Sequence, residues 1–134
     1  MTLIMTDLTF KGVYEMTNLY DETVTILESH DKTIADIEYI GSSETKINTN
    51  KALELMKKTN YYSGYGGQEI AENLMIKGNG FIMTRGEYDG SEWWDYMQTD
   101  PSLPQVERDV KSFKANIGWD SLEGINGLED TKND

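Results

Sequence analysis

The single histidine of the chain, His30, is the first candidate for acid–base or metal chemistry. It lies in a polar run between Glu28 and Lys32, beside Asp31. Either kind of chemistry needs several groups that converge on one point. The chain has no cysteine, which excludes disulfides, thiol nucleophiles and cysteine-based metal sites. A zinc ion would then depend on carboxylates around one imidazole, an atypical ligand set, so we interpret His30 as a turn residue.

Carboxylates are the next candidates, because Asp89, Glu92 and Asp95 are close together in the sequence. Carboxylate oxygens are ligands that Ca²⁺ and Mg²⁺ prefer. Their spacing differs from that of a calcium-binding loop, in which ligands alternate and a glutamate ends the loop. We therefore expect neither a metal ion nor a cofactor.

The segment Tyr61–Gly67 combines three tyrosines with three glycines. A glycine-rich loop can bind phosphate where it leads into a helix. This one matches neither the P-loop nor the dinucleotide-binding motif, and no Lys or Arg lies between Lys58 and Lys77. We interpret it as a turn, with a small-ligand binder built on its tyrosines as an alternative. Since no serine lies in a nucleophile-elbow motif either, we predict that the protein is not an enzyme.

The strongest feature of the composition is negative charge: 24 Asp and Glu stand against 12 Lys and Arg, a formal net charge of −12. Two stretches have no basic residue, because Gly12–Asp31 contains five carboxylates and Gly86–Glu107 contains six. Such a surface repels phosphate backbones and anionic lipid headgroups. We predict no direct binding to nucleic acid or membranes, and a basic protein as the partner.

The second acidic stretch also contains two adjacent tryptophans, and aromatic side chains are frequent anchors at protein interfaces. A negative face with aromatic anchors would complement a basic partner. The alternative is that the carboxylates only increase solubility and that the tryptophans lie in the core. The partner-binding residues predicted in this stretch are Glu87, Asp89, Glu92, Trp93, Trp94 and Asp95.

Residues 118–134 form an acidic segment with three glycines and a row of apolar residues at every third position. The glycines and carboxylates disfavour a stable element. A period of three suits one face of an extended segment that lies in an apolar groove. We predict a loose tail that docks on a partner, on a second copy or on the domain itself, through Trp119, Leu122 and Ile125.

Strands are predicted where Thr, Val, Ile and Tyr are frequent, because these residues suit a pleated, half-buried surface. A hairpin is expected from residues 22–28 and 33–40. A second hairpin is expected from residues 81–88 and 92–97, since Asp89-Gly90 favours a tight turn. Two further strands are predicted at residues 2–10 and 13–16.

The spacing of apolar residues predicts three helices. Residues 48–59 begin with a capping residue, Asn48 or Asn50. A short helix is expected at residues 68–76, where apolar residues are four apart. A third helix is expected at residues 103–117, where the spacing alternates between three and four along Leu103, Val106, Val110, Phe113 and Ile117.

These elements together predict an α+β fold, in which a small antiparallel sheet of two hairpins is covered by about three helices. Residues 1–117 would form one domain, and residues 118–134 its loose acidic tail. No stretch has the roughly 20 apolar residues of a membrane span, and no basic leader precedes an apolar run. We expect the protein in the cytoplasm.

Low alanine, frequent Asn, Lys and Ile, small size and strong acidity resemble the composition of small phage or mobile-element inhibitors of host nucleic-acid enzymes. These inhibitors include anti-CRISPR and antirestriction proteins. The resemblance implies a protein that occupies the basic nucleic-acid-binding groove of a host enzyme such as a nuclease, in the cytoplasm of the host cell. The alternative from another class is a virion structural or assembly protein that forms homo-oligomers.

Overall fold

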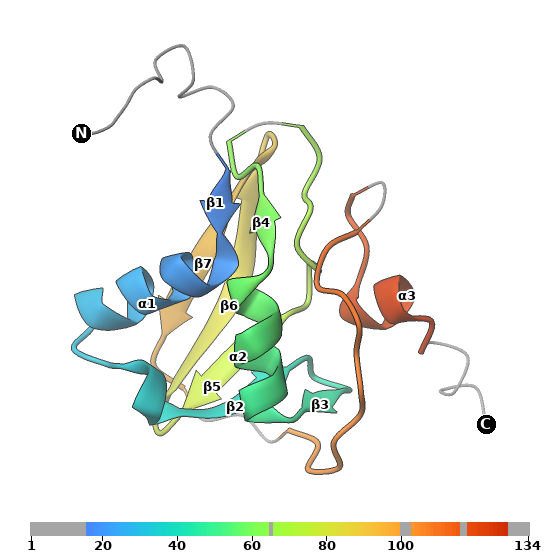
Figure 1. Cartoon of the computed structure of the whole chain (residues 1–134). Helices are drawn as coiled ribbons and strands as arrows, with labels where there is room; N and C mark the ends of the chain where they lie inside the picture. The colour runs from blue at the N-terminus through green and yellow to red at the C-terminus, as the bar shows by residue number, and fades with distance from the viewer. Residues whose placement is uncertain (1–15, 65, 100–102, 116–117, 129–134) are drawn as a thin grey trace.

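The computed structural model describes residues 16–64, 66–99, 103–115 and 118–128, and its centre is an antiparallel sheet (Figure 1). The strand order is β3-β2-β5-β6-β7. The α+β class is therefore confirmed, with one five-stranded sheet where two hairpins were expected. The strands are β2 (Ile37–Gly41), β3 (Lys46–Ile47), β5 (Met75–Gly78), β6 (Phe81–Tyr88) and β7 (Ser91–Met97).

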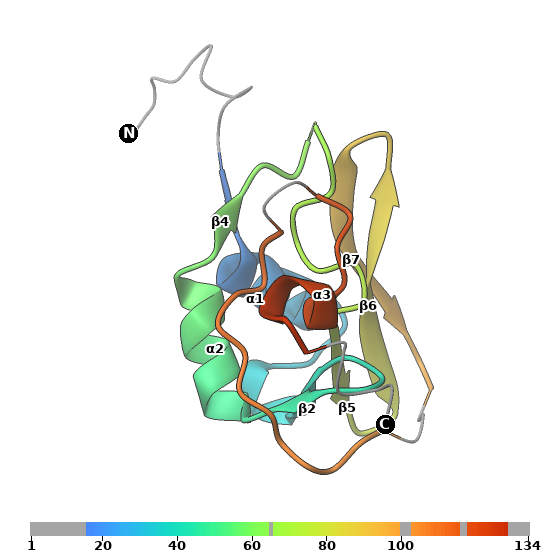
Figure 2. The same cartoon turned by 90° about the vertical axis from the view of Figure 1, so that its right-hand side faces the viewer.

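The helices lie on one side of this sheet, which Figure 2 shows nearly edge-on. They are α1 (Leu19–Ser29), α2 (Thr49–Lys57) and the short α3 (Leu122–Asn126). A 3-10 turn, η3 (Ile34–Asp36), leads into β2. A separate two-stranded ladder, β1 (Thr17–Asn18) with β4 (Asn60–Tyr61), joins the start of α1 to the end of α2.

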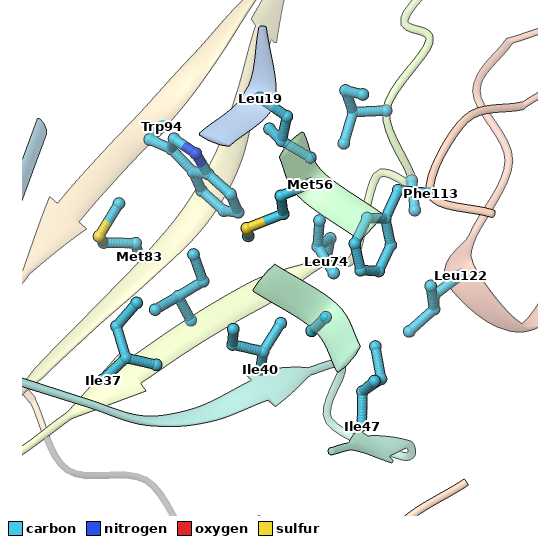
Figure 3. Close-up of a cluster of buried hydrophobic side chains, with 14 of the residues drawn as sticks. Leu19, Ile37, Ile40, Ile47, Met56, Leu74, Met83, Trp94, Phe113 and Leu122 are labelled. Carbon is cyan, nitrogen blue, oxygen red and sulfur yellow. The ribbon is translucent and has the colours of Figure 1, made fainter. Parts of the chain in front are cut away.

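The core lies between the helices and the sheet (Figure 3). Burying these side chains supplies the main driving force for folding, at about 25 cal/mol per Å² of apolar surface. The C-terminal segment contributes two of them, Phe113 and Leu122, both fully buried. Other fully buried residues of the core are Leu19, Leu27, Ile40, Met56, Ile70, Leu74, Ile76 and Met83.

Two predicted elements are confirmed, and both have strong local signals. The helix expected at residues 48–59 is α2, and Asn48 caps it by accepting the N–H of Lys51 at 3.0 Å. The second hairpin is β6–β7, which turns through Asp89 and Gly90. Both turn residues have positive φ (54° and 89°), as the tight turn of a two-residue hairpin requires.

The first predicted hairpin is wrong, because residues 22–28 belong to α1. The helix is capped by Asn18, which accepts the N–H of Asp21 at 3.0 Å. Leu19, Thr23 and Leu27, four residues apart, are fully buried on one face of the helix. Packing of this face overrides the strand preference of the Thr, Val and Ile residues between them.

The helix predicted at residues 68–76 is also wrong. This segment is irregular up to Leu74, and β5 then begins at Met75. The N–H of Ala71 bonds to the carbonyl of Phe113 at 2.7 Å, and β5 pairs with both β2 and β6. Hydrogen bonds to distant segments therefore replace those that a helix would make.

The helix predicted at residues 103–117 is absent from the described part of that range, residues 103–115. This segment runs along the domain in irregular form and makes isolated bridges to Lys46 and Ile70. Its expected apolar stripe is split, because Val106 is 79% exposed while Phe113 is fully buried. Backbone bonds such as Arg108 N–H to the Lys46 carbonyl (2.6 Å) favour this course over a helix.

The loose tail predicted at residues 118–134 is unconfirmed, because residues 118–128 carry α3 and pack on the domain. Glu123 joins this segment to the β2–β3 loop, since its carboxylate accepts the hydroxyls of Ser42 and Thr45 and the amide of Asn73. Residues 129–134 lie outside the described ranges, as do the strands predicted at 2–10 and 13–16 except for Met16, which is not in a strand.

Candidate functional site

The β6–β7 hairpin carries all six residues predicted in the second acidic stretch, and its register divides them between two faces. Arg85 pairs with Trp94, and Gly86 pairs with Trp93. Residues that pair across an antiparallel ladder point to the same face, and neighbours along a strand point to opposite faces. One face therefore meets the helices, and the other faces away from them.

The inner face holds a buried ion-pair network centred on Arg85. The guanidinium donates through Nη2 to Glu92 Oε1 at 3.1 Å and to the Tyr61 hydroxyl at 2.9 Å. It lies 3.4 Å from a carboxylate oxygen of Glu22 on α1 and 4.7 Å from the ring of Trp94. The side chains of Arg85 and Glu92 are fully buried, so this network is part of the protein interior.

Two backbone N–H groups also join this network. Glu92 accepts the N–H of Glu69 at 2.7 Å and of Ile70 at 3.3 Å. Burial nevertheless raises the pKa of Glu92 above its ordinary value, against the opposing effect of these N–H groups and of Arg85. Burial also raises the pKa of Tyr61 far above its ordinary value, so its hydroxyl stays protonated and donates to Glu22 Oε1 at 2.5 Å.

Two of the predicted partner-binding residues, Glu92 and Trp94, consequently lie in the interior. Trp94 is 3% exposed, and its indole N–H donates to Thr23 of α1 at 2.9 Å. Trp94 fixes the hairpin to α1, and Glu92 fixes it to the irregular segment at Glu69 and Ile70. These two buried side chains support the exposed residues of the hairpin from beneath.

The other four predicted residues are Trp93 and Asp95 on the outer face, Asp89 in the turn, and Glu87 next to the turn on the face of Glu92. Glu87, Asp89 and Asp95 are exposed, and Trp93 is 38% exposed. Two residues that the sequence did not single out join them, since Tyr88 is 77% and Met97 is 57% exposed. We call this set the hairpin surface: Glu87, Tyr88, Asp89, Trp93, Asp95 and Met97.

The indole of Trp93 is held in place on this surface. Its Nε1–H donates to Asp95 Oδ1 at 2.9 Å. The ring lies directly over Gly86, where an added Cβ would come within 2.5 Å of Nε1. The absence of a side chain at Gly86 therefore leaves room for the indole, and the bond to Asp95 holds Trp93 in this place before any partner arrives.

The three predicted residues of the tail are placed elsewhere. Trp119 is 57% exposed, has a positive φ of 57° and packs against Gly67. Leu122 is fully buried, and Ile125 is partly buried against the core. None of them belongs to the hairpin surface, although all three lie in the segment that α3 anchors.

His30 and the tyrosine–glycine loop also have structural positions. His30 follows the last turn of α1 and stacks on Tyr96, with ring centroids 3.7 Å apart. Tyr61 is fully buried in the Arg85 network. The carbonyl of Ser63 accepts the N–H of Glu92 at 2.9 Å, so the loop joins the start of β7.

Arg85 was not predicted to be part of the site, although the sequence contains a signal for it. Phe81, Met83 and Arg85 alternate along β6, so a charged residue continues the apolar face of a strand. A charge in that position has to be paired when it is buried. Two of its partners, Glu22 and Tyr61, could not be named from the sequence because they come from distant segments.

A groove of about 400 Å³ lies between α2 and the segment around Val110, with Ile47, Ala52 and Leu55 also in its lining. A neighbouring hollow of about 280 Å³ continues it toward Phe113. Figure 2 shows α2 and the hairpin on opposite sides of the molecule. Seven basic residues lie in α2 or in the segments beside it: Lys46, Lys51, Lys57, Lys58, Arg108, Lys111 and Lys114.

Within the described residues, no group of three or more His, Asp or Glu side chains could hold a metal ion. In the same part of the chain, no helix is both long enough and apolar enough to cross a bilayer. No family model matches the chain, and comparisons with curated proteins and with solved structures give no match. Its function has to be inferred from its own residues.

Proposed function

We propose that this protein is a non-enzymatic binding module that uses the hairpin surface to bind a basic surface of another protein. The observation that carries this proposal is the grouping of three exposed carboxylates with three exposed large apolar side chains on one hairpin. Aromatic residues and methionine are enriched at the centres of protein interfaces. Carboxylates around them select a partner of opposite charge.

The hairpin is suited to this role because it is anchored from beneath. Arg85, Glu92 and Trp94 connect its inner face to α1 and to residues 61–70. Binding through a rigid element avoids much of the entropy cost of ordering side chains and loops on association. The backbone that carries the exposed carboxylates is therefore anchored before the partner binds.

The charge of the whole chain also favours such a partner. A net charge of −12 attracts a basic protein over a distance of about one Debye length and speeds the encounter. We propose the basic nucleic-acid-binding groove of a host enzyme as the surface that is bound, with inhibition as the result. The absence of cysteine from the sequence fits a reducing compartment such as the cytoplasm.

Capture of the partner from the native host tests this proposal, with duplex DNA as a competitor. Added duplex should displace a partner that is held through its nucleic-acid groove, and moderate salt should weaken its capture. A partner that stays bound in the presence of duplex and of salt would contradict the proposal and would favour assembly through apolar contacts.

Two variants with the same change in formal charge show whether the hairpin surface is responsible. The hairpin variant carries Glu87→Lys, Asp89→Asn and Asp95→Lys. Asn is used at position 89 because φ there is 54°, a conformation that Asn tolerates. Glu92 is left unchanged because reversing its charge would break the Arg85 network.

The control variant carries Glu54→Lys, Glu107→Lys and Asp109→Asn, all at exposed positions on the α2 side. The ion pairs lost there, Lys57–Glu54 and Lys51–Asp109, are exposed and are worth at most about 1 kcal/mol each. We expect the control variant to retain the partner and the hairpin variant to lose it. Equal capture by both variants would contradict the proposal.

A further inference from the structure

Strand β7 lies at one edge of the five-stranded sheet, with β6 as its neighbour on the other side. An edge strand presents unpaired backbone N–H and C=O groups, to which another strand can bond. Proteins commonly block such edges with lysine, proline or a bulge. The sequence of β7, Ser-Glu-Trp-Trp-Asp-Tyr-Met, contains neither lysine nor proline, and its pairing with β6 is unbroken from Ser91 to Met97.

The position of one hydrogen bond identifies the backbone groups that face outward. The N–H of Glu92 donates to the carbonyl of Ser63 at 2.9 Å, so this N–H points away from β6. In an antiparallel ladder, residues alternate between those that bond to the neighbouring strand and those that point away from it. Trp94 and Tyr96, two and four residues further along, consequently direct their N–H and C=O groups outward.

The loop at Ser63 covers the edge only at its beginning. Among the described residues, no backbone or side-chain group bonds to the outward N–H groups of Trp94 and Tyr96. The side chains on the outer face at this edge are Trp93, Asp95 and Met97, all of them exposed. An unpaired stretch of backbone thus adjoins the acidic and aromatic side chains of the hairpin surface.

We propose that β7 accepts an extended basic segment of the partner as an additional strand. This inference rests on the proposed function and adds its mode of binding. Main-chain hydrogen bonds to Trp94 and Tyr96 would supply affinity, and alternate side chains would supply specificity. In an alternating segment, the added strand would place its basic side chains on the outer face, across from Asp95, and its apolar side chains on the opposite face, beside Trp94 and Tyr96.

Charge argues for a basic partner segment and against a second copy of this chain. Two β7 strands paired edge to edge would bring the exposed carboxylate of Asp95 toward its equivalent. Like charges across a strand pair are destabilising, and two chains of net charge −12 repel each other. A segment that alternates basic and apolar residues avoids both the repulsion across the strand pair and the repulsion between two acidic chains.

Amide hydrogen exchange on the full chain, followed by NMR, tests this inference with a short peptide of alternating Lys and Val as the probe. In the free protein, the amides of Trp94 and Tyr96 should exchange quickly. The amides of Trp93 and Asp95, which bond to β6, should be protected and serve as internal controls. A saturating amount of the peptide should slow exchange at Trp94 and Tyr96 by at least about tenfold.

Backbone methylation of the probe separates strand addition from simple charge attraction. One peptide is N-methylated at alternate residues along one edge, and a second is N-methylated along the other edge. A strand that adds to β7 uses one edge only, so one methylated peptide should bind much more weakly than the other. Equal affinity of the two methylated peptides would overturn the inference.

The remaining outcomes are also decisive. Protection of Trp94 and Tyr96 in the free protein would overturn the inference, because the edge would already be covered by the chain itself or by a second copy. Binding of the probe with unchanged exchange at both amides would overturn strand addition but leave the proposed function in place. No binding to the wild-type chain at low salt would overturn both.

Discussion

Burying a guanidinium group beneath a hairpin is costly unless the charges around it are paired and hydrogen-bonded. Arg85 meets that condition through Glu22, Glu92 and Tyr61, which come from three different parts of the chain. Burial lowers the pKa of Arg85, but the negative charge of Glu22 and the contacts with Tyr61 and Glu92 outweigh this effect and raise it. The guanidinium therefore stays charged, and its neighbours depend on it.

Replacing Arg85 by methionine should destabilise the fold strongly, because it leaves the buried carboxylate of Glu92 without a cation. We expect Arg85→Met to lower the free energy of unfolding by about 3–5 kcal/mol. Adding Glu92→Gln should recover part of this loss, since the amide oxygen can still accept the N–H groups of Glu69 and Ile70. Urea unfolding measures both values, and a loss below about 1 kcal/mol for Arg85→Met would show that the network is dispensable.

Glu123 should make stability depend on acid pH. Burial raises its pKa, but hydrogen bonds from Ser42, Thr45 and Asn73 outweigh this effect and lower it below the ordinary value of 4.5. A carboxyl whose pKa is lower in the folded state stabilises the protein above its unfolded pKa and loses that contribution as pH falls through the folded pKa. Glu123→Gln should therefore be less stable than the wild type at neutral pH, and the difference should shrink below about pH 4.5. A difference that stays constant with pH would contradict this assignment.

At the scale of elements, the sequence predicted α2 and the β6–β7 hairpin because their signals are local. A capping asparagine fixes the start of α2, and the Asp89-Gly90 pair fixes the turn of the hairpin. Once that turn is set, the period of two places Glu92 and Trp94 on one face and Trp93 and Asp95 on the other. Which face is buried could not be predicted, because the helices that cover it come from distant parts of the chain.

Apart from α1, where packing overrides a strand preference, the elements that sequence reasoning missed are those whose hydrogen bonds are long-range. Residues 103–115 have a helical spacing of apolar residues, yet their partners lie at Lys46 and Ile70. The side chain of Asn126 also accepts the N–H groups of Lys111 and Ser112, at 2.7 and 3.0 Å. Pairings between segments so far apart in the sequence have no local signature.

One pair of substitutions tests the observed course of the C-terminal segment. Leu122→Ala should cost about 2–5 kcal/mol because the side chain is fully buried in the core. Val106→Ala should change stability by less than about 0.5 kcal/mol because Val106 is exposed, although a helix at 103–117 would have buried it. Thermal and urea unfolding provide both values. A neutral Leu122→Ala or a costly Val106→Ala would contradict the packing described above.

At the scale of the whole molecule, the two sides differ in charge among the described residues. The hairpin surface has three exposed carboxylates and no basic residue, whereas seven basic residues lie in α2 or beside it, together with the exposed carboxylates Glu54, Glu107 and Asp109. We expect this difference to orient a basic partner toward the hairpin.

We expect the basic residues around α2 not to bind nucleic acid, because the net negative charge of the protein repels a phosphate backbone. In a gel-shift experiment at physiological salt, the wild-type chain should leave random duplex DNA unshifted at micromolar concentrations. A shift that disappears when Lys51, Lys58 and Lys111 are replaced by glutamine would show that the basic side overrides the net charge.

A map of amide chemical shifts tests the central claim, binding through the hairpin surface, most directly. The ¹⁵N-labelled full chain is titrated at low ionic strength with the alternating Lys–Val peptide, and a Glu–Val peptide serves as the control. We predict saturable shifts centred on residues 86–97, loss of these shifts in the hairpin variant and their retention in the α2-side control variant. Shifts centred on α2, or an unchanged response in the hairpin variant, would contradict the claim.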